Sequence, residues 1–230
     1  MVIHVIDTET TGFSSDPTAH VVEVAMVTLV PGRGITSTFS SLVKPPVLTQ
    51  EGLDICMKIS GITQGELESA PDPASVKDEL LRIIGRWGGG VTAWNLAFDR
   101  TMIRRTLFGL DELGVLKRMA RDEIEQEALL SKYGWPEVLP MAEDPMPWTQ
   151  WCAMWAYAKQ CPDVRGKHQI PLTDAWRNNA WRLEAAAARE SVKLEGAHRA
   201  LVDATATAQI LDLMLADRLA PKTEPENQPE

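Results

Sequence analysis

The stretch VIHVIDTETTG, residues 2–12, decides the fold of this chain. Its first five residues form a short, largely apolar run that ends at Asp7, which predicts a buried strand. Asp7 and Glu9 lie two residues apart, so their side chains point to the same face of that strand. Residues 10–12 follow, and they are of types that favour a turn. The stretch therefore predicts a pair of carboxylates at the end of a core strand, although a solvated strand end is the ordinary explanation of such a pair.

The rest of the chain continues with strands and then alternates strands with helices. Residues 21–30 and 36–43 are rich in β-branched side chains and are closed by proline turns, which predicts two more strands joined in a meander. Apolar residues recur at a helical period in 74–87 and in 197–219. The remaining expected elements are a short strand at 91–94 and helices at 98–107, 149–159 and 173–193. This order predicts an α/β layer fold.

The length of 230 residues, with 44% hydrophobic residues, predicts a single globular domain over residues 1–220. Proline-rich sequence predicts an insertion at about 108–148, and the polar, proline-containing residues 221–230 predict a disordered tail. Four of the eight tryptophans lie in or near the insertion. These four are Trp135, Trp148, Trp151 and Trp155. They form either a platform on which nucleic-acid bases stack or a local hydrophobic core, which is the more common arrangement.

Composition excludes several classes of protein. No apolar run approaches the roughly 20 residues that cross a bilayer, so we expect no membrane contact. The three scattered cysteines predict neither a disulfide framework nor a zinc site, which favours a reducing, cytoplasmic location. The net charge of −9 argues against a protein that coats nucleic acid. It does not argue against an enzyme that meets phosphate through bound cations, because such ions can reverse the local sign of a site.

Two further groups of polar residues lie at predicted element boundaries. Asp99 follows Asn95 and Phe98 where a strand passes into a helix, and a carboxylate there is as readily a helix N-cap. His198 precedes Asp203 near the start of the last helix. A histidine in this place is either a surface or capping residue or a general base. Asp203 lies beside an apolar stripe, and a bound metal would explain it.

These groups together supply enough carboxylate to hold two hard divalent cations, and they add one base. Two metal ions and a base are a known means of cutting phosphodiesters with water. A nearby arginine cluster could contact phosphate or could equally form a solvated helix face. It comprises Arg100, Arg104 and Arg105.

Taken jointly, the three groups resemble the motifs of the DEDDh 3′–5′ exonucleases. The first motif matches at residues 7–12, the second at 95–99 and the third at 197–204, in the family's order and spacing. The resemblance runs from about residue 2 to residue 215. It implies a ribonuclease H-like fold in which helices flank a mixed five-stranded sheet.

The resemblance also implies roles for individual residues. Two Mg²⁺ or Mn²⁺ ions would be held by four carboxylates, those of Asp7, Glu9, Asp99 and Asp203, and His198 would deprotonate the attacking water. Residues that flank the carboxylates are expected to bind substrate; they are Thr8, Thr10, Thr11, Gly12, Asn95 and Phe98. The implied reaction releases nucleoside 5′-monophosphates from the 3′ end of single-stranded or frayed DNA, with RNA as an alternative substrate.

The expected partners are single-stranded nucleic acid 3′ ends. Trp94 and Ser60 stand where many relatives have histidine, and the segment after Leu107 is longer than in compact relatives. These departures leave DNA versus RNA, processivity and pathway open. The resemblance allows a homodimer, whereas a polymerase partner is unsupported because the chain has no obvious clamp-binding motif.

Three other functions compete with the exonuclease hypothesis. A catalytically silent nucleic-acid-binding module of the same fold is expected to have lost at least one metal carboxylate, and none is lost here. A protein-interaction scaffold would use the tryptophan-rich region as its contact surface. A two-metal endonuclease would cut a circular substrate, which an exonuclease cannot do.

Overall fold

The computed structural model describes residues 1–110, 146–160 and 182–219 of the chain. The strands in these segments are β1 (Ile3–Thr10), β2 (Val21–Val30), β3 (Gly34–Leu42) and β4 (Gly90–Thr92). The helices are α1 (Gln50–Ile59), α2 (Gln64–Glu68), α3 (Pro73–Trp87), α4 (Leu96–Phe108), α7 (Ala153–Gln160), α10 (Leu183–Arg189) and α11 (Ala200–Leu219). None of the helices in these segments is long and apolar enough to cross a membrane.

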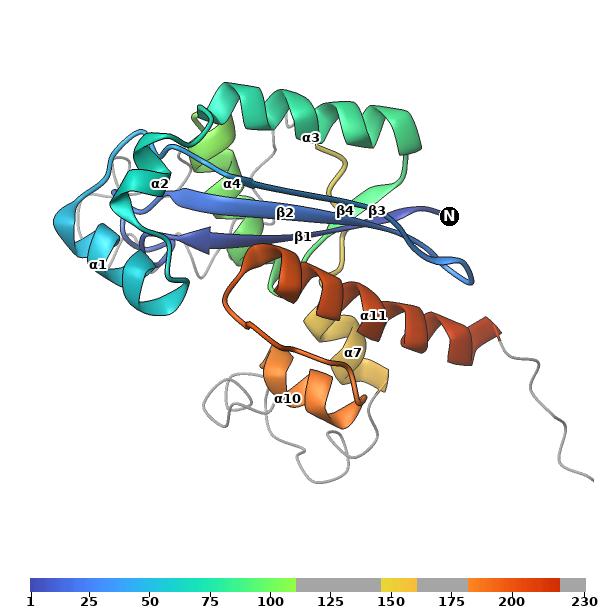
Figure 1. The fold of residues 1–230 in the computed structure, drawn as a ribbon. Helices are drawn as coiled ribbons and strands as arrows, with labels where there is room; N and C mark the ends of the chain where they lie inside the picture. The colour runs from blue at the N-terminus through green and yellow to red at the C-terminus, as the bar shows by residue number, and fades with distance from the viewer. Residues whose placement is uncertain (111–145, 161–181, 220–230) are drawn as a thin grey trace, which may run out of the picture.

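The strands form one mixed sheet in the order β3-β2-β1-β4. β1 pairs antiparallel with β2 and parallel with β4, and β2 pairs antiparallel with β3. Helix α3 covers one side of the sheet and α11 the other, with α7 and α10 packed beyond α11 (Figure 1). Because helices cover both faces of the sheet, nearly all side chains of β2 are buried, and buried and exposed side chains do not alternate along it. The expected α/β architecture is confirmed.

The described residues form four strands, so the expectation of a five-stranded sheet is corrected for this part of the chain. Within the described residues, a single parallel bridge lies beyond β4, between Val91 and Trp148. The amide of Val91 donates to the carbonyl of Pro147 at 2.9 Å, and the amide of Thr149 donates to the carbonyl of Val91 at 2.8 Å. Pro147 has no N–H group, so it cannot add a bond to the ladder.

Several expected elements are confirmed at their predicted places. The expected strand at 21–30 is β2, and the expected helices at 74–87 and 98–107 are α3 and α4, extended by one or two residues. The insertion expected at 108–148 lies almost wholly outside the described residues, as does the tail at 221–230.

Helix α1 was not expected from the sequence, and it packs against the turn that follows β1. It begins after Thr49, whose side chain accepts a hydrogen bond from the amide of Gly52 at 3.0 Å. A Cβ atom at Gly52 would lie 2.8 Å from the Cβ of Thr11, so only glycine permits this approach. The buried residues Leu53 and Cys56 lie three positions apart, so the sequence at 50–59 carries a helical spacing that the prediction missed.

Gly52→Ala is expected to destabilise the protein by about 1–3 kcal/mol, the usual cost of overpacking a close contact. Alanine ordinarily stabilises a helix relative to glycine, so the sign of the effect reports the contact with Thr11. Gly65→Ala in α2 is the matched control, because its Cβ would meet nothing within 4 Å. Urea unfolding of both variants checks this expectation, and equal stabilisation of the two would contradict it.

Candidate metal centre and active site

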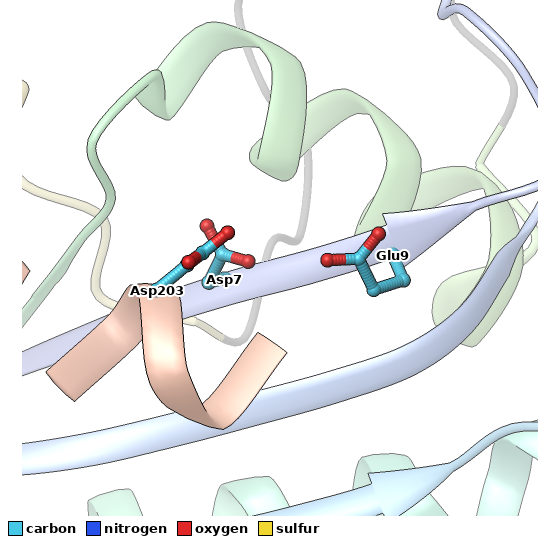
Figure 2. A group of neighbouring side chains, drawn as sticks. All are labelled: Asp7, Glu9 and Asp203. Atoms are coloured by element: carbon cyan, nitrogen blue, oxygen red, sulfur yellow. The ribbon is translucent and has the colours of Figure 1, made fainter. Parts of the chain in front are cut away.

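Three carboxylates from distant parts of the sequence meet beside β1. Asp7 and Glu9 lie on β1, and Asp203 lies in the first turn of α11. One ligand atom from each lies within 4.8 Å of the others. Figure 2 shows Asp203 directed at Asp7, with Glu9 further along the same strand. The predicted same-face placement of Asp7 and Glu9 is therefore found, and α11 brings the third carboxylate to that face.

The fourth predicted carboxylate, Asp99 on α4, lies near Asp7 but is not among the three carboxylates whose ligand atoms meet. It is 4% exposed and accepts a hydrogen bond from the hydroxyl of Thr8 at 2.8 Å. Thr8 points away from the face used by Asp7 and Glu9 because side chains alternate along a strand. The charge of Asp99 still acts on Asp7, whose pKa it helps to raise. Asn95 occupies the N-cap of α4, so Asp99 is not the capping residue.

Burial raises the pKa of every one of these carboxyl groups. Loss of water is the largest cause throughout, and it raises the pKa of Glu9 to about 8, that of Asp99 to about 7 and that of Asp203 to about 6. The pKa of Asp7 is raised well above its usual value by burial and then by the neighbouring carboxylates. Four negative charges in this space repel one another, and a bound cation would remove the repulsion.

One carboxylate oxygen shows that these residues fit a divalent cation. Asp203 Oδ2 accepts a 3.3 Å hydrogen bond from the backbone amide of His198. Asp203 Oδ1 is buried and has no hydrogen-bond partner among the residues that the structure describes. A buried polar atom without a partner is costly, and Mg²⁺ and Mn²⁺ prefer carboxylate oxygen as a ligand. The donor set is therefore suited to hard divalent ions.

His198 lies on the turn that leads into α11. Its side chain is exposed, and its backbone has a φ of 66°, in the left-handed region that non-glycine residues rarely adopt. Such strain persists where surrounding contacts enforce it. Exposure suits a base that must meet both water and substrate, so the structure is compatible with the predicted role of His198.

The threonines expected to bind substrate are engaged within the protein. The hydroxyl of Thr8 donates to Asp99. The hydroxyl of Thr10 donates to the carbonyl of Gly12 at 2.8 Å, and that of Thr11 accepts from the amide of His20 at 2.8 Å. These hydroxyls hold Asp99 and the turn in place, so their contact with substrate stays a prediction.

Two of the three remaining expected substrate residues precede Asp99 in the chain; the third, Gly12, lies in the turn after β1. Asn95 is partly buried and makes no side-chain capping bond. Phe98 is partly buried and packs against the main core. Both are near enough in sequence to Asp99 to share its end of α4, and their role in binding substrate stays a prediction.

Two of the three clustered arginines are buried, which corrects both interpretations for those two residues. Arg104 and Arg105 are 3% and 5% exposed, so they belong neither to a solvated helix face nor to an open phosphate site. The guanidinium of Arg105 donates to the carbonyls of Ser14 and Asp16 at 2.8 and 2.7 Å, and to that of Ala19 at 3.1 Å. It thereby holds the loop that follows the first motif. No local sequence pattern signals this role, because the bonded partners lie about 90 residues away.

The tryptophans within the described residues serve mainly as core. Trp94 is buried, and its ring centroid lies 5.8 Å from that of Tyr157 on α7. Trp148 and Trp155 pack against the main core, whereas Trp151 is 38% exposed. The local-core interpretation therefore holds for Trp148 and Trp155; Trp135 lies outside the described residues.

Residues 4–111 match the family model RNase_T, whose description is exonuclease. The match contains the first and second motifs and ends before His198 and Asp203, which the fold brings to the same site. A search of curated proteins found no match.

Solved structures of exonucleases share the fold over nearly the whole chain. The nuclease domain of 3′hExo, a DEDDh family member bound to rAMP, is 20% identical; the match covers 94% of this chain and 92% of that one, with a TM-score of 0.57. A 3′-exonuclease solved in recognition of the 3′ end of a histone mRNA stem-loop is 18% identical, with coverage of 94% and 64% and a TM-score of 0.59. Exonuclease I of E. coli in complex with a dT13 oligonucleotide is 17% identical, with coverage of 95% and 43% and a TM-score of 0.59.

This chain spans less than two thirds of the length of several such proteins, including a full-length 3′-exonuclease of which it covers 61%. The resemblance that the three motifs indicated is confirmed. Residues 4–111 match the exonuclease family model, and the described residues share the fold of solved 3′-exonucleases, one of them a DEDDh family member.

Proposed function

We propose that this protein is a metal-dependent 3′–5′ exonuclease. It hydrolyses phosphodiester bonds at the 3′ end of single-stranded or frayed DNA, with RNA as the alternative substrate, and releases nucleoside 5′-monophosphates. The observation that carries the proposal is the gathering of partly buried carboxylates, with an oxygen on Asp203 that has no hydrogen-bond partner among the described residues. A catalytically silent module would not need to keep such a costly set of charges.

Each residue of the site has a distinct part in the proposed reaction. Asp7, Glu9, Asp99 and Asp203 would hold two Mg²⁺ or Mn²⁺ ions, and the hydroxyl of Thr8 orients Asp99. When bound, the ions supply Lewis-acid stabilisation of the attacking and leaving oxygens.

His198 takes a proton from the attacking water at a ring nitrogen. The water oxygen bonds to phosphorus as the bond from phosphorus to the 3′ oxygen breaks. The shortened strand keeps that oxygen as a 3′-hydroxyl after it gains a proton from solvent, and the terminal nucleotide leaves with a 5′-phosphate.

We propose nucleic acid as the substrate because of the chemistry of the site and the similarity of the fold to solved exonucleases. Among the similar structures, one holds a dT13 oligonucleotide and another recognises a histone mRNA stem-loop. DNA and RNA therefore both belong in the test. A cytoplasmic location and a homodimer are further proposals that rest on the sequence alone.

An end-label assay tests the proposal. With Mn²⁺, 5′-labelled single-stranded DNA is expected to shorten one nucleotide at a time from its 3′ end, and 3′-labelled DNA to release labelled mononucleotide at once. Short RNA and DNA with a mismatched 3′ end complete the panel, and Asp203→Asn is the inactive control. Absence of mononucleotide from every substrate would overturn the proposal. Cutting of a circular strand would assign the site to an endonuclease.

A further inference from the structure

Glu23 is a buried carboxylate beside the site that none of the three motifs includes. It lies on β2 directly opposite Glu9 of β1, and it is 3% exposed. Residues directly opposite each other in a sheet share a face, so Glu23 faces the side on which Asp7, Glu9 and Asp203 meet. A buried carboxylate needs partners to offset the loss of water, and those of Glu23 come from the other end of the chain.

Both oxygens of Glu23 bind the residues that begin α11. Glu23 Oε1 accepts from Arg199 Nη2 at 2.8 Å, and Glu23 Oε2 accepts from Arg199 Nε at 3.0 Å, a two-bond pairing that fixes the guanidinium in orientation as well as in position. Oε2 also accepts from the backbone amide of Ala200 at 3.1 Å. Ala200 is the first residue of α11, so Glu23 caps this helix from a neighbouring strand.

The residue clamped in this way is the immediate neighbour of His198. His198 holds a left-handed backbone, which is unfavourable for a residue with a side chain. Its own amide is tied to Asp203, and the next two residues are tied to Glu23. The turn is therefore fixed on both sides of the strained residue.

We infer that Glu23 and Arg199 are positioning residues, which form a clamp that holds the turn carrying His198 in its left-handed conformation. The clamp acts through His198 and does not itself touch the reacting atoms. Its catalytic consequence rests on the proposed function, whereas its structural consequence can be measured in the metal-free protein without substrate.

Hydrogen exchange of the metal-free protein tests the structural consequence. Glu23→Gln and Arg199→Met are expected to speed exchange in the peptide 196–203 by about tenfold or more, the change expected when a hydrogen bond to a charged group is lost. Glu79→Gln and Arg82→Met are the matched controls, because they break an exposed ion pair within α3. Unchanged exchange in the peptide 196–203 would overturn the clamp whatever the activity of the protein.

Steady-state kinetics at saturating Mn²⁺ tests the catalytic consequence. Glu23→Gln is expected to lower kcat by about 10–100-fold, the usual effect of losing a supporting contact, with KM changed by less than about threefold. Arg199→Lys should retain part of kcat, because lysine keeps the charge but not the two-bond geometry.

Repeating the Glu23→Gln substitution in a protein that lacks His198 shows whether its effect on kcat depends on His198. In a His198→Asn protein, Glu23→Gln is expected to lower kcat by less than about threefold further, since residues that act as a unit are not additive. An equal loss in both backgrounds, or a loss expressed mainly in KM, would overturn the positioning role. Failure of the wild-type protein to release mononucleotides would instead overturn the proposed function, and hydrogen exchange would still decide the clamp.

Discussion

Mn²⁺ is expected to raise the melting temperature of the metal-free protein by about 5–10 °C at pH 8 and by much less at pH 5.5. An ion at a hundred times its dissociation constant stabilises the folded state by about 2.7 kcal/mol. In a chain of this size each kcal/mol is worth about 2–4 °C. Thermal denaturation at the two pH values, with and without Mn²⁺, measures the difference.

The direction of the pH effect follows from the raised pKa values of the cluster. Burial raises the pKa of Glu9 to about 8 and that of Asp99 to about 7, above their values in an unfolded chain. The folded state therefore binds more protons than the unfolded state between about pH 4 and 8, so stability falls as the pH rises through this range. Ions compete with those protons for the same oxygens, and their stabilisation is greatest where the cluster is ionised.

The Asp203→Asn variant distinguishes Mn²⁺ binding at the carboxylate cluster from a nonspecific effect of Mn²⁺ on stability. The substitution removes one charge, so the metal-free variant is expected to be more stable than wild type at pH 8 and to lose most of its response to Mn²⁺. Asp212→Asn is the matched control, because it lies on the same helix without a place in the cluster. A full Mn²⁺ response in Asp203→Asn, or equal responses at both pH values, would contradict the metal assignment.

His198→Ala is expected to lower kcat by roughly 10²–10⁴-fold, the usual contribution of a positioned general base. The melting temperature should change little, because the side chain is exposed. Cleavage of a labelled oligonucleotide at saturating substrate and Mn²⁺ measures the loss.

Two further variants distinguish the imidazole of His198 from its backbone. Glycine and asparagine adopt the left-handed region more readily than alanine does. His198→Gly and His198→Asn should therefore keep the turn and still lose kcat to a similar extent. Near-wild-type activity in either variant would contradict the role of His198 as the base.

The sheet and its main helices were predictable because their apolar residues recur at clear periods. β2 is a run of β-branched and apolar residues that ends in a Pro-Gly turn, and α3 has buried residues at helical spacing between its cap and Gly88. Helix α1 was missed although its cap at Thr49 is a local signal; only the close approach of Gly52 to the first motif depends on tertiary packing. The strand count was wrong for the described residues because Pro147 interrupts the edge beyond β4.

The carboxylates were predictable because each adjoins an apolar segment that makes its position distinctive. Their supporting contacts were not. Glu23 lies inside the apolar run of β2, where sequence indicates a strand and gives no hint of Arg199, 176 residues further on. Arg105 likewise finds its carbonyl partners only after α4 packs against the loop at 14–19. Such contacts depend on tertiary packing, which local patterns do not encode.

The most direct test of the central claim is anomalous diffraction from crystals of the protein soaked with Mn²⁺ and a nucleoside 5′-monophosphate. Carboxylates from β1, α4 and α11 are expected to hold two manganese ions roughly 3.5–4 Å apart. Two peaks at that separation beside Asp7, with Asp203 Oδ1 close to one of them, are the result we predict. A single peak elsewhere, or none beside Asp7, would contradict the two-metal site.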